Sequence, residues 1–301
     1  IAYNNLPYLI LEHPVSYSYS ATMLMNEGKI SDRNTSNSLL AMAPDYKKAQ
    51  DINNLYSGIE RNKLAALPYA KDEIKGITDI YNGQQLTDFN ATKENFCKKA
   101  NEFDILHLAM HAEINDENPM YSRLVFAESA NTKNEGMLNT SDIYNLNLNS
   151  KLVVLSACNT GNGKLRSGEG VMSLSRAFLY AGCKSVIMTL WAVEDKAGSE
   201  LMISFYEYLS KGYSKDKAMQ LAKIDYIKHS PASKSHPYYW AAYVPIGDQC
   251  PLNQSPKDYS SMAYFALLAG IGIGITPFFT NRKLKRRITN IFRLRSKVFN
   301  C

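Results

Sequence analysis

The chain has 301 residues, of which 45% are hydrophobic and 21% are charged, and its formal net charge is +6. This length fits one large α/β domain or two smaller ones, and the ordinary composition excludes wholesale disorder. Residues 282–301 hold eight Lys or Arg and no acid, so subtracting them leaves −2 for the remainder. The basicity therefore belongs to the tail, and a nucleic-acid-binding fold has little support.

The five cysteines are odd in number and scattered, with no C-x-x-C spacing: Cys97, Cys158, Cys183, Cys250 and Cys301. This pattern argues against both a disulfide framework and a zinc knuckle. The chain begins at Ile1 without a charged-then-apolar leader, so we predict no signal peptide here. The missing Met suggests a fragment of a longer protein.

The first half of the chain alternates strand-like and helix-like segments. We predict strands at 8–12, 39–43, 85–89 and 104–111, and helices from about 20, over 68–81 and over 92–100. Pro44 stops the second strand, and Asn82-Gly83 is a usual helix end. Thr92 can cap the following helix, with Glu94 in its first turn. Residues 46–64 are polar and are expected to form a surface excursion.

The second half continues the alternation. We predict strands at 123–128, 152–158, 185–191 and 239–244, and helices at 140–144, 171–181, 195–211 and 215–228. Thr140 or Ser141 can cap the first of these helices, and Gly182 stands where a helix-ending glycine belongs. Strands alternating with helices of this length predict an α/β fold: right-handed βαβ units and a mainly parallel sheet covered by helices on both faces.

The character of the chain changes after Asp248. Residues 249–261 are expected to form a linker between a domain at 1–248 and the C-terminal segments. Residues 260–281 hold no charge, which favours a transmembrane helix at 262–280; a buried terminal helix of the domain is the alternative. The basic tail at 281–301 follows at once. By the positive-inside rule the tail is cytoplasmic, and the domain lies in the periplasm or outside the cell.

Two strand-like runs end in residues whose side chains can act in catalysis. One is Asp104-Ile-Leu-His-Leu-Ala-Met-His111, and the other ends at Cys158 before a turn containing Gly161 and Gly163. Catalysis in parallel sheets occurs beyond the carboxyl ends of the strands, and a thiol needs a base such as histidine to become a nucleophile. The glycine-rich turn and the helix start after it favour a thiolate and an oxyanion. The sequence thus predicts a His111–Cys158 pair.

Two other motifs are weaker matches. His107 and His111 have the spacing of the helical H-E-x-x-H zinc motif, but Leu108 replaces the Glu and the pattern is that of a strand. We therefore interpret His107 as a hydrogen-bonded structural histidine that faces the same way as His111. The turn at 158–165 resembles a phosphate-binding loop, but Cys158 replaces its first Gly and Leu165 its Ser or Thr, so a nucleotide site is rejected.

Three acids are expected near the rim of this site: Glu169, Glu194 and Asp195. They are candidates for binding a basic side chain of a substrate. Glu169 and Asp195 stand at predicted helix starts, where acids are common because of the helix dipole alone.

The chain resembles a CHAT domain, the caspase-like (clan CD) module often found after tetratricopeptide repeats in bacteria. The residues that carry the resemblance are the His111 run, Leu152-Val-Val-Leu-Ser-Ala-Cys-Asn-Thr-Gly161, Thr189-Leu-Trp-Ala-Val193 and His236-Pro-Tyr-Tyr-Trp-Ala-Ala-Tyr-Val244. It covers residues 1 to about 248 and implies a caspase-like three-layer sandwich. It also implies a Cys-His dyad peptidase, which maps onto Cys158 and His111.

The resemblance further implies an oxyanion held by the backbone N–H groups of Cys158 and Ala112. The chain departs from the family pattern at Met110, Asn159 and Ala112, where Thr or Ser, Glu and Gly are common. None of these changes removes the dyad, although Ala112 bears on the oxyanion geometry.

We therefore expect a membrane-tethered cysteine endopeptidase, a hydrolase of protein substrates that needs no metal or organic cofactor. An upstream repeat domain is expected in the full-length protein. The alternative is a non-catalytic signalling or docking module controlled by those repeats. Acyl transfer to an acceptor other than water would use the same site.

Overall fold

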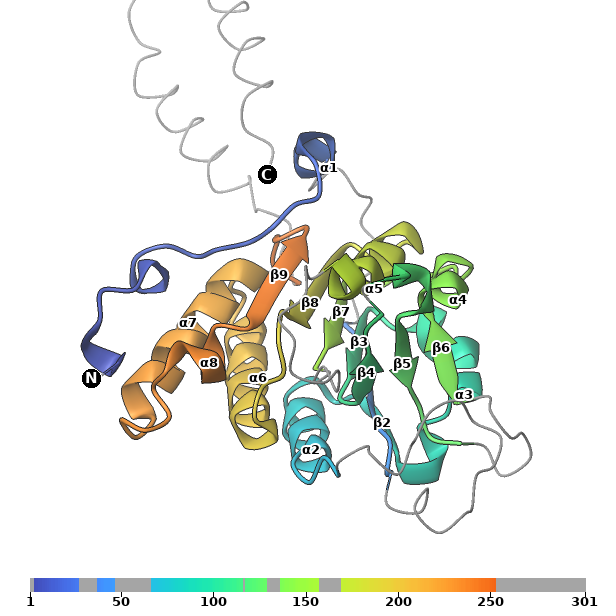
Figure 1. Ribbon diagram of the computed structural model, residues 1–301, viewed down its shortest axis with the longest axis horizontal. Coiled ribbons are helices and arrows are strands. Elements are labelled where there is room, and N and C mark those ends of the chain that lie inside the picture. The colour runs from blue at the N-terminus through green and yellow to red at the C-terminus, as the bar shows by residue number, and fades with distance from the viewer. Residues whose placement is uncertain are drawn as a thin grey trace, which may run out of the picture.

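The computed structural model describes residues 3–26, 37–46, 66–115, 117–128, 136–156 and 169–252 (Figure 1). Cys158 lies outside these ranges, as do the predicted membrane helix at 262–280, the basic tail and most of the predicted linker. None of the helices within the described ranges is both long enough and apolar enough to cross a membrane.

A six-stranded sheet forms the centre of the domain. Its strands lie in the order β2 (Gln84–Thr87), β1 (Leu39–Ala43), β3 (Ile105–Leu108), β7 (Leu152–Leu155), β8 (Ser185–Thr189) and β9 (Tyr243–Gly247). Every pairing is parallel except β8–β9, which is antiparallel. The prediction of an α/β fold with a mainly parallel sheet is therefore confirmed.

Helices cover both faces of this sheet, which makes three layers (Figure 1). One face packs against α2 (Ala70–Tyr81), α6 (Asp195–Ser210) and α7 (Lys215–His229); the other packs against α3 (Lys93–Lys99), α4 (Thr140–Tyr144) and α5 (Glu169–Tyr180). The strands are apolar on both sides, as parallel strands buried between helices require. In β3, for example, Ile105 faces the α6–α7 core and Leu106 the α3–α5 core.

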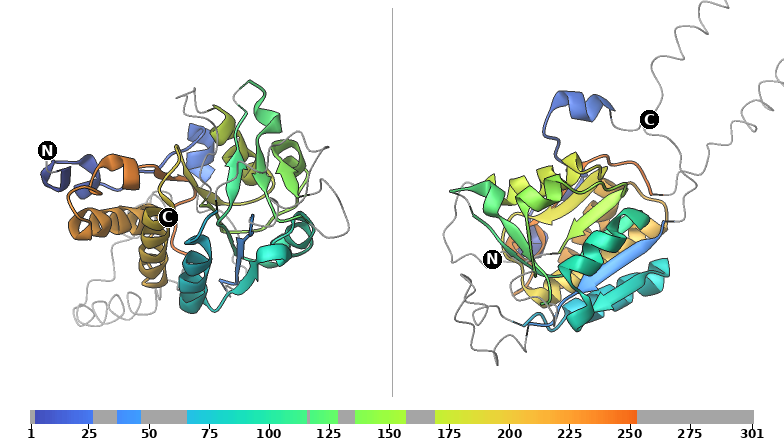
Figure 2. Two further views of the ribbon diagram at one scale, coloured as in Figure 1. Left: turned by 60° about the horizontal axis from the view of Figure 1, so that its bottom comes forward. Right: turned by 90° about the vertical axis from the view of Figure 1, so that its right-hand side faces the viewer.

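Shorter elements complete the described chain. They are α1 (Ala21–Asn26), α8 (Pro237–Trp240) and the 3₁₀ turns η1 (Tyr3–Asn5), η2 (Leu9–Leu11), η5 (Asp88–Asn90), η6 (Ala100–Glu102) and η7 (Pro119–Tyr121). A second, three-stranded antiparallel sheet is ordered β4 (His111–Glu113), β5 (Arg123–Val125), β6 (Met137–Asn139). Both views of Figure 2 show this small sheet standing apart from the main one.

The small sheet corrects the predicted strand at 104–111. This segment is two strands: β3 ends at Leu108, and His111 is the first residue of β4. Ala109 still bonds through its N–H to Met42 O of β1, and then the chain passes into the second sheet. His107 and His111 therefore do not share a strand, so the premise from which we expected them to face the same way is wrong.

Capping residues explain several helix limits. Asn82 ends α2 in the left-handed conformation (φ 48°), as its Asn-Gly pair predicts, and Thr92 Oγ1 accepts the N–H of Asn95 at the start of α3. The predicted caps of α4 are wrong. Asn139, rather than Thr140 or Ser141, caps that helix in a reciprocal capping box with Asp142.

The predicted strand at 8–12 is wrong in type, since the segment forms η2. The N–H groups of Leu11 and Glu12 bond back to the carbonyls of Tyr8 and Leu9, so they are not available for a sheet. An apolar run of strand length thus folds as a local turn.

The predicted strand at 239–244 begins too early, because its first part belongs to α8. Pro237 occupies the first turn of this helix, and His236 Nδ1 accepts the N–H of Tyr238 at its N-cap. The strand β9 starts only at Tyr243.

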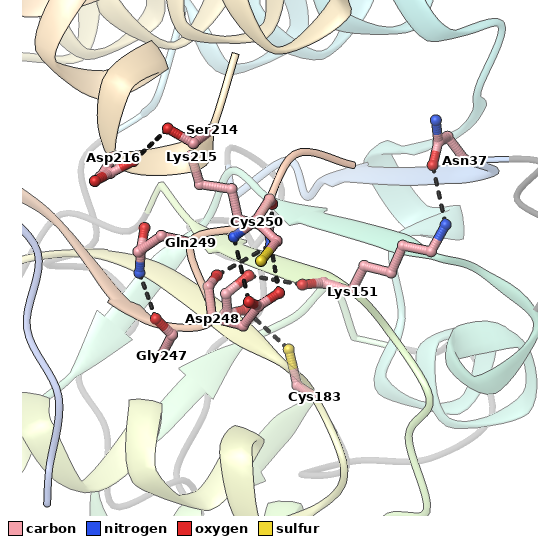
Figure 3. A network of polar contacts seen from close by, with 11 residues as sticks. Asn37, Lys151, Cys183, Ser214, Lys215, Asp216, Gly247, Asp248, Gln249 and Cys250 are labelled. Carbon is pink, nitrogen blue, oxygen red and sulfur yellow. Dashed lines mark hydrogen bonds and ion pairs between the residues drawn. The ribbon is translucent and has the colours of Figure 1, made fainter. Parts of the chain in front are cut away.

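A buried lysine fixes the chain where it leaves β9 (Figure 3). Lys215 is 1% exposed, and its Nζ donates to Asp248 O, Asp248 Oδ2 and Cys250 O at 2.9–3.2 Å, which uses all three of its hydrogens. Burial alone would raise the pKa of Asp248, but the Lys215 charge and hydrogen bonds outweigh it and lower that pKa. Packing against the domain thus continues as far as Leu252.

Gly182, which follows α5, is expected to tolerate no side chain. Its φ is +110°, and an added Cβ would lie 2.2 Å from Leu148 O. Gly212 is a matched control, because its φ is +85° but an added Cβ would meet nothing within 4 Å. We predict that Gly182→Ala lowers the free energy of unfolding by about 3 kcal/mol and Gly212→Ala by about 1 kcal/mol, measured by urea unfolding. Equal losses would contradict this assignment of the clash.

Candidate active site

The two strands that precede the candidate dyad are neighbours. β3 and β7 pair in parallel with Leu108 opposite Leu155, which confirms that the His111 and Cys158 runs lie side by side. His111 follows Leu108 by three residues, and in the sequence Cys158 follows Leu155 by three residues. The two residues thus stand at equal distances along the chain beyond paired carboxyl ends, although Cys158 lies outside the described residues.

His111 is buried, and its backbone is held by Tyr46, which follows the end of β1. Its backbone N–H donates to Tyr46 Oη at 3.0 Å, and the centroids of the two rings lie 4.7 Å apart. The Tyr46 hydroxyl in turn donates to Val125 O at 2.7 Å. Tyr46 was not predicted to have a role, because it begins the polar segment expected to form a surface excursion and no local motif marks it.

Ala112, the residue whose N–H is expected to contribute to the oxyanion site, follows His111 in β4. It is 4% exposed and stands opposite Leu124 of β5. The strand therefore fixes the backbone at the position expected to contribute to the oxyanion site.

His107 has the structural role that the sequence predicts. Its ring is fully buried, with Nε2 2.9 Å from Glu73 Oε1 on α2 and Nδ1 3.2 Å from Tyr206 Oη on α6. A carboxylate can only accept, so Nε2 donates to it, and in the neutral ring Nδ1 then accepts from the tyrosine. Burial raises the pKa of Tyr206 well above its usual range, which keeps this hydroxyl protonated.

The two expected substrate-binding acids that can be described, Glu194 and Asp195, already have partners. Glu194 forms an ion pair with Lys234 at 2.8 Å, and Asp195 Oδ2 accepts the N–H of Tyr69 at 2.7 Å. Burial raises the pKa of Asp195, and the bond from Tyr69 only partly offsets this. Glu169 is the first residue of α5, and its side chain is outside the described atoms.

Two other cysteines differ sharply in their surroundings. Cys183 is buried, its Sγ donates to Ser185 O at 2.9 Å, and burial raises its pKa to about 12, so it is an unreactive thiol at neutral pH. Cys97 is exposed on α3, and partial burial of its thiol raises its pKa. Among the described residues, no group of three or more His, Cys, Asp or Glu is arranged to hold a metal ion.

Comparison with known proteins identifies the family. A family model described as the CHAT domain matches residues 2–248. The chain belongs to the CHAT domain family. This CHAT domain is 28% identical over 233 residues to tetratricopeptide repeat protein 28 from Homo sapiens and 27% identical to its Mus musculus counterpart. Each match covers 67% of this chain and 9% of the relative, so the chain spans about a tenth of the length of these relatives.

Similar solved structures include a separase–securin complex and a cysteine proteinase. The chain matches Saccharomyces cerevisiae separase, solved with securin, at a TM-score of 0.46 and 14% identity over 82% of this chain and 14% of that one. It matches the Arg-specific cysteine proteinase gingipain R at a TM-score of 0.46 and 12% identity over 77% of this chain and 51% of that one.

The His107–Glu73 pair gives a direct test of a structural histidine. Glu73→Leu would leave a buried N–H without an acceptor, and we predict a loss of about 3 kcal/mol in the free energy of unfolding. Glu73→Gln keeps an acceptor oxygen, and we expect it to lose about 1 kcal/mol. Denaturant unfolding of both variants measures this difference. Indistinguishable variants would show that the hydrogen bond to His107 contributes little.

Proposed function

We propose that this CHAT domain is a caspase-like cysteine endopeptidase in which His111 and Cys158 form the catalytic dyad. The observation that carries the proposal is the pairing of Leu108 with Leu155, beyond which the two residues follow at the same offset. Family membership supports it, because residues 2–248 match the CHAT domain throughout. The substrate is a protein or peptide.

The proposed reaction is acyl transfer to water. His111 takes the proton of the Cys158 thiol, and the thiolate forms a bond to a peptide carbonyl carbon. The N–H groups of Ala112 and Cys158 donate to the resulting oxyanion. The C–N bond then breaks as His111 gives its proton to the leaving amine, and a thioester remains. Water, deprotonated by His111, then forms a bond to the thioester carbon. The C–S bond breaks, a carboxylic acid leaves, and His111 returns its proton to the Cys158 sulfur. No metal or organic cofactor enters these steps.

Glu169, Glu194 and Asp195 remain the proposed contacts for a basic substrate side chain. Of the two whose side chains the structure describes, Glu194 is the more easily released from its present partner, because its ion pair with Lys234 lies on the surface, where both side chains are about 40% exposed. Exposed pairs of this kind contribute about 0–1 kcal/mol, so a substrate cation could replace Lys234 at little cost.

Substitution of the dyad tests the enzymatic proposal. Cys158→Ala and His111→Ala should each reduce cleavage of an amide-linked fluorogenic peptide library by about 10⁴-fold, and the double variant should be no worse, because the two groups act as a unit. Cys97→Ser, which changes the exposed cysteine of α3, is the matched control and should cleave as the unsubstituted chain does.

Two outcomes would contradict the proposal. Cleavage retained in Cys158→Ala would exclude this nucleophile. A chain that cleaves no peptide, and in which no thiol-reactive peptide modifies Cys158, would instead be a non-catalytic signalling or docking module controlled by upstream repeats.

We further propose that residues 262–280 anchor the domain to a membrane, with the basic tail in the cytoplasm. The charge-free run at 260–281 followed directly by the basic cluster supports this. An upstream repeat domain is proposed as well, since the curated relatives are named tetratricopeptide repeat proteins.

Membrane anchoring can be tested in the full chain. Ile271→Arg places a charge at the middle of the predicted helix, at a cost of about 3 kcal/mol, so we expect the protein to move from the carbonate-resistant membrane fraction to the supernatant. Leu284→Arg, in the basic tail, is the control and should stay in the membrane fraction. Extraction of the unsubstituted chain by carbonate would contradict the anchor.

A further inference from the structure

A side chain outside the proposed dyad connects three parts of the structure at His111. Tyr46 stands three residues after the end of β1, is 4% exposed and packs with Val125 and Leu67. Its hydroxyl accepts the N–H of His111 and donates to the carbonyl of Val125. One phenol therefore joins the exit of the main sheet to two strands of the small sheet, β4 and β5.

The two hydrogen-bond partners of Tyr46 lie opposite each other on neighbouring strands of the small sheet. His111 and Val125 are register partners in the antiparallel pair β4–β5. The Tyr46 hydroxyl is bonded to the N–H of one and the C=O of the other, so a side chain bridges the two strands at the first residue of β4. The backbone position of His111 consequently depends on a residue 65 positions earlier in the chain.

The ring of Tyr46 restrains the same histidine from another direction. The phenol and imidazole planes are inclined at 48° with 4.7 Å between their centroids, which is ordinary contact between aromatic rings. A rotation of the His111 ring toward Tyr46 would meet this phenol. Backbone and ring contacts together thus limit where the imidazole can point.

We propose that Tyr46 is a positioning residue for His111, acting through the backbone hydrogen bond and the ring contact. This inference rests on the proposed dyad. It gives the phenol a role beyond packing, since a base must be within hydrogen-bond reach of its proton and small displacements of a catalytic group are costly. The hydroxyl itself forms no bond to the substrate in this proposal.

The test is the rate at which iodoacetamide alkylates each cysteine of the full chain, followed by mass spectrometry. Tyr46→Phe keeps the ring and removes only the hydroxyl, and we expect about tenfold slower alkylation of Cys158, because a displaced His111 activates the thiol poorly. The rate at the exposed Cys97 should not change. Cys183 is buried, so its alkylation marks unfolding, and rates are compared at temperatures where it stays unmodified.

Two further variants separate positioning from stability. Tyr206→Phe also removes a buried hydroxyl, one that bonds to a ring nitrogen of His107. It should lower the free energy of unfolding about as much as Tyr46→Phe does and leave the rate of Cys158 alkylation unchanged. Leu67→Ala loosens the packing around Tyr46 without removing a hydrogen bond, and we expect less than a twofold change in that rate.

The outcomes distinguish this inference from the proposed function. If His111→Ala slows Cys158 alkylation and Tyr46→Phe does not, the dyad stands and the positioning role is wrong. If His111→Ala has no effect on the Cys158 rate, the dyad fails and the positioning role fails with it. An equal slowing in Tyr206→Phe would mean that general loss of stability, rather than Tyr46, controls the rate.

Discussion

The parallel pairing of β3 with β7 is the constraint on which the site depends. Both strands are buried on both faces, so apolar patterning alone specifies their register weakly. The hydrogen-bonded pair of His107 and Glu73 makes one register of β3 more favourable than the others. A slip of β3 by one residue would turn His107 toward the apolar α3–α5 core and leave the Glu73 carboxylate buried without its partner, which is costly. The bond joins β3 to α2, so a histidine that takes no part in the proposed chemistry specifies the register of β3.

His111 itself belongs to a different element from the strand that leads to it. It opens β4, the edge of the small sheet, and its N–H is bonded to Tyr46 rather than to the main sheet. Two features therefore position the proposed base. One is the register of the central strands, and the other is the Tyr46 bridge at the start of β4.

Much of the fold could be predicted because local rules and tertiary packing agree. Strand β1 ends before Pro44, and α2 ends at Asn82, as the sequence indicates. The split of the 104–111 run was not predictable, because Ala109 and Met110 are apolar and buried, so no change in hydrophobicity marks the end of β3. Tyr46 was not predictable either. Its two partners are 65 and 79 positions away, and a tyrosine in a polar segment gives no local signal of such contacts.

We propose that His111 and Cys158 meet beyond the ends of β3 and β7. A crystal structure of the chain would test it most directly through one distance, that between Cys158 Sγ and the nearer ring nitrogen of His111. We predict a separation of about 4 Å or less, with no side chain between the two groups. A much longer separation, with the two residues walled off from each other also in the presence of a bound peptide, would contradict it.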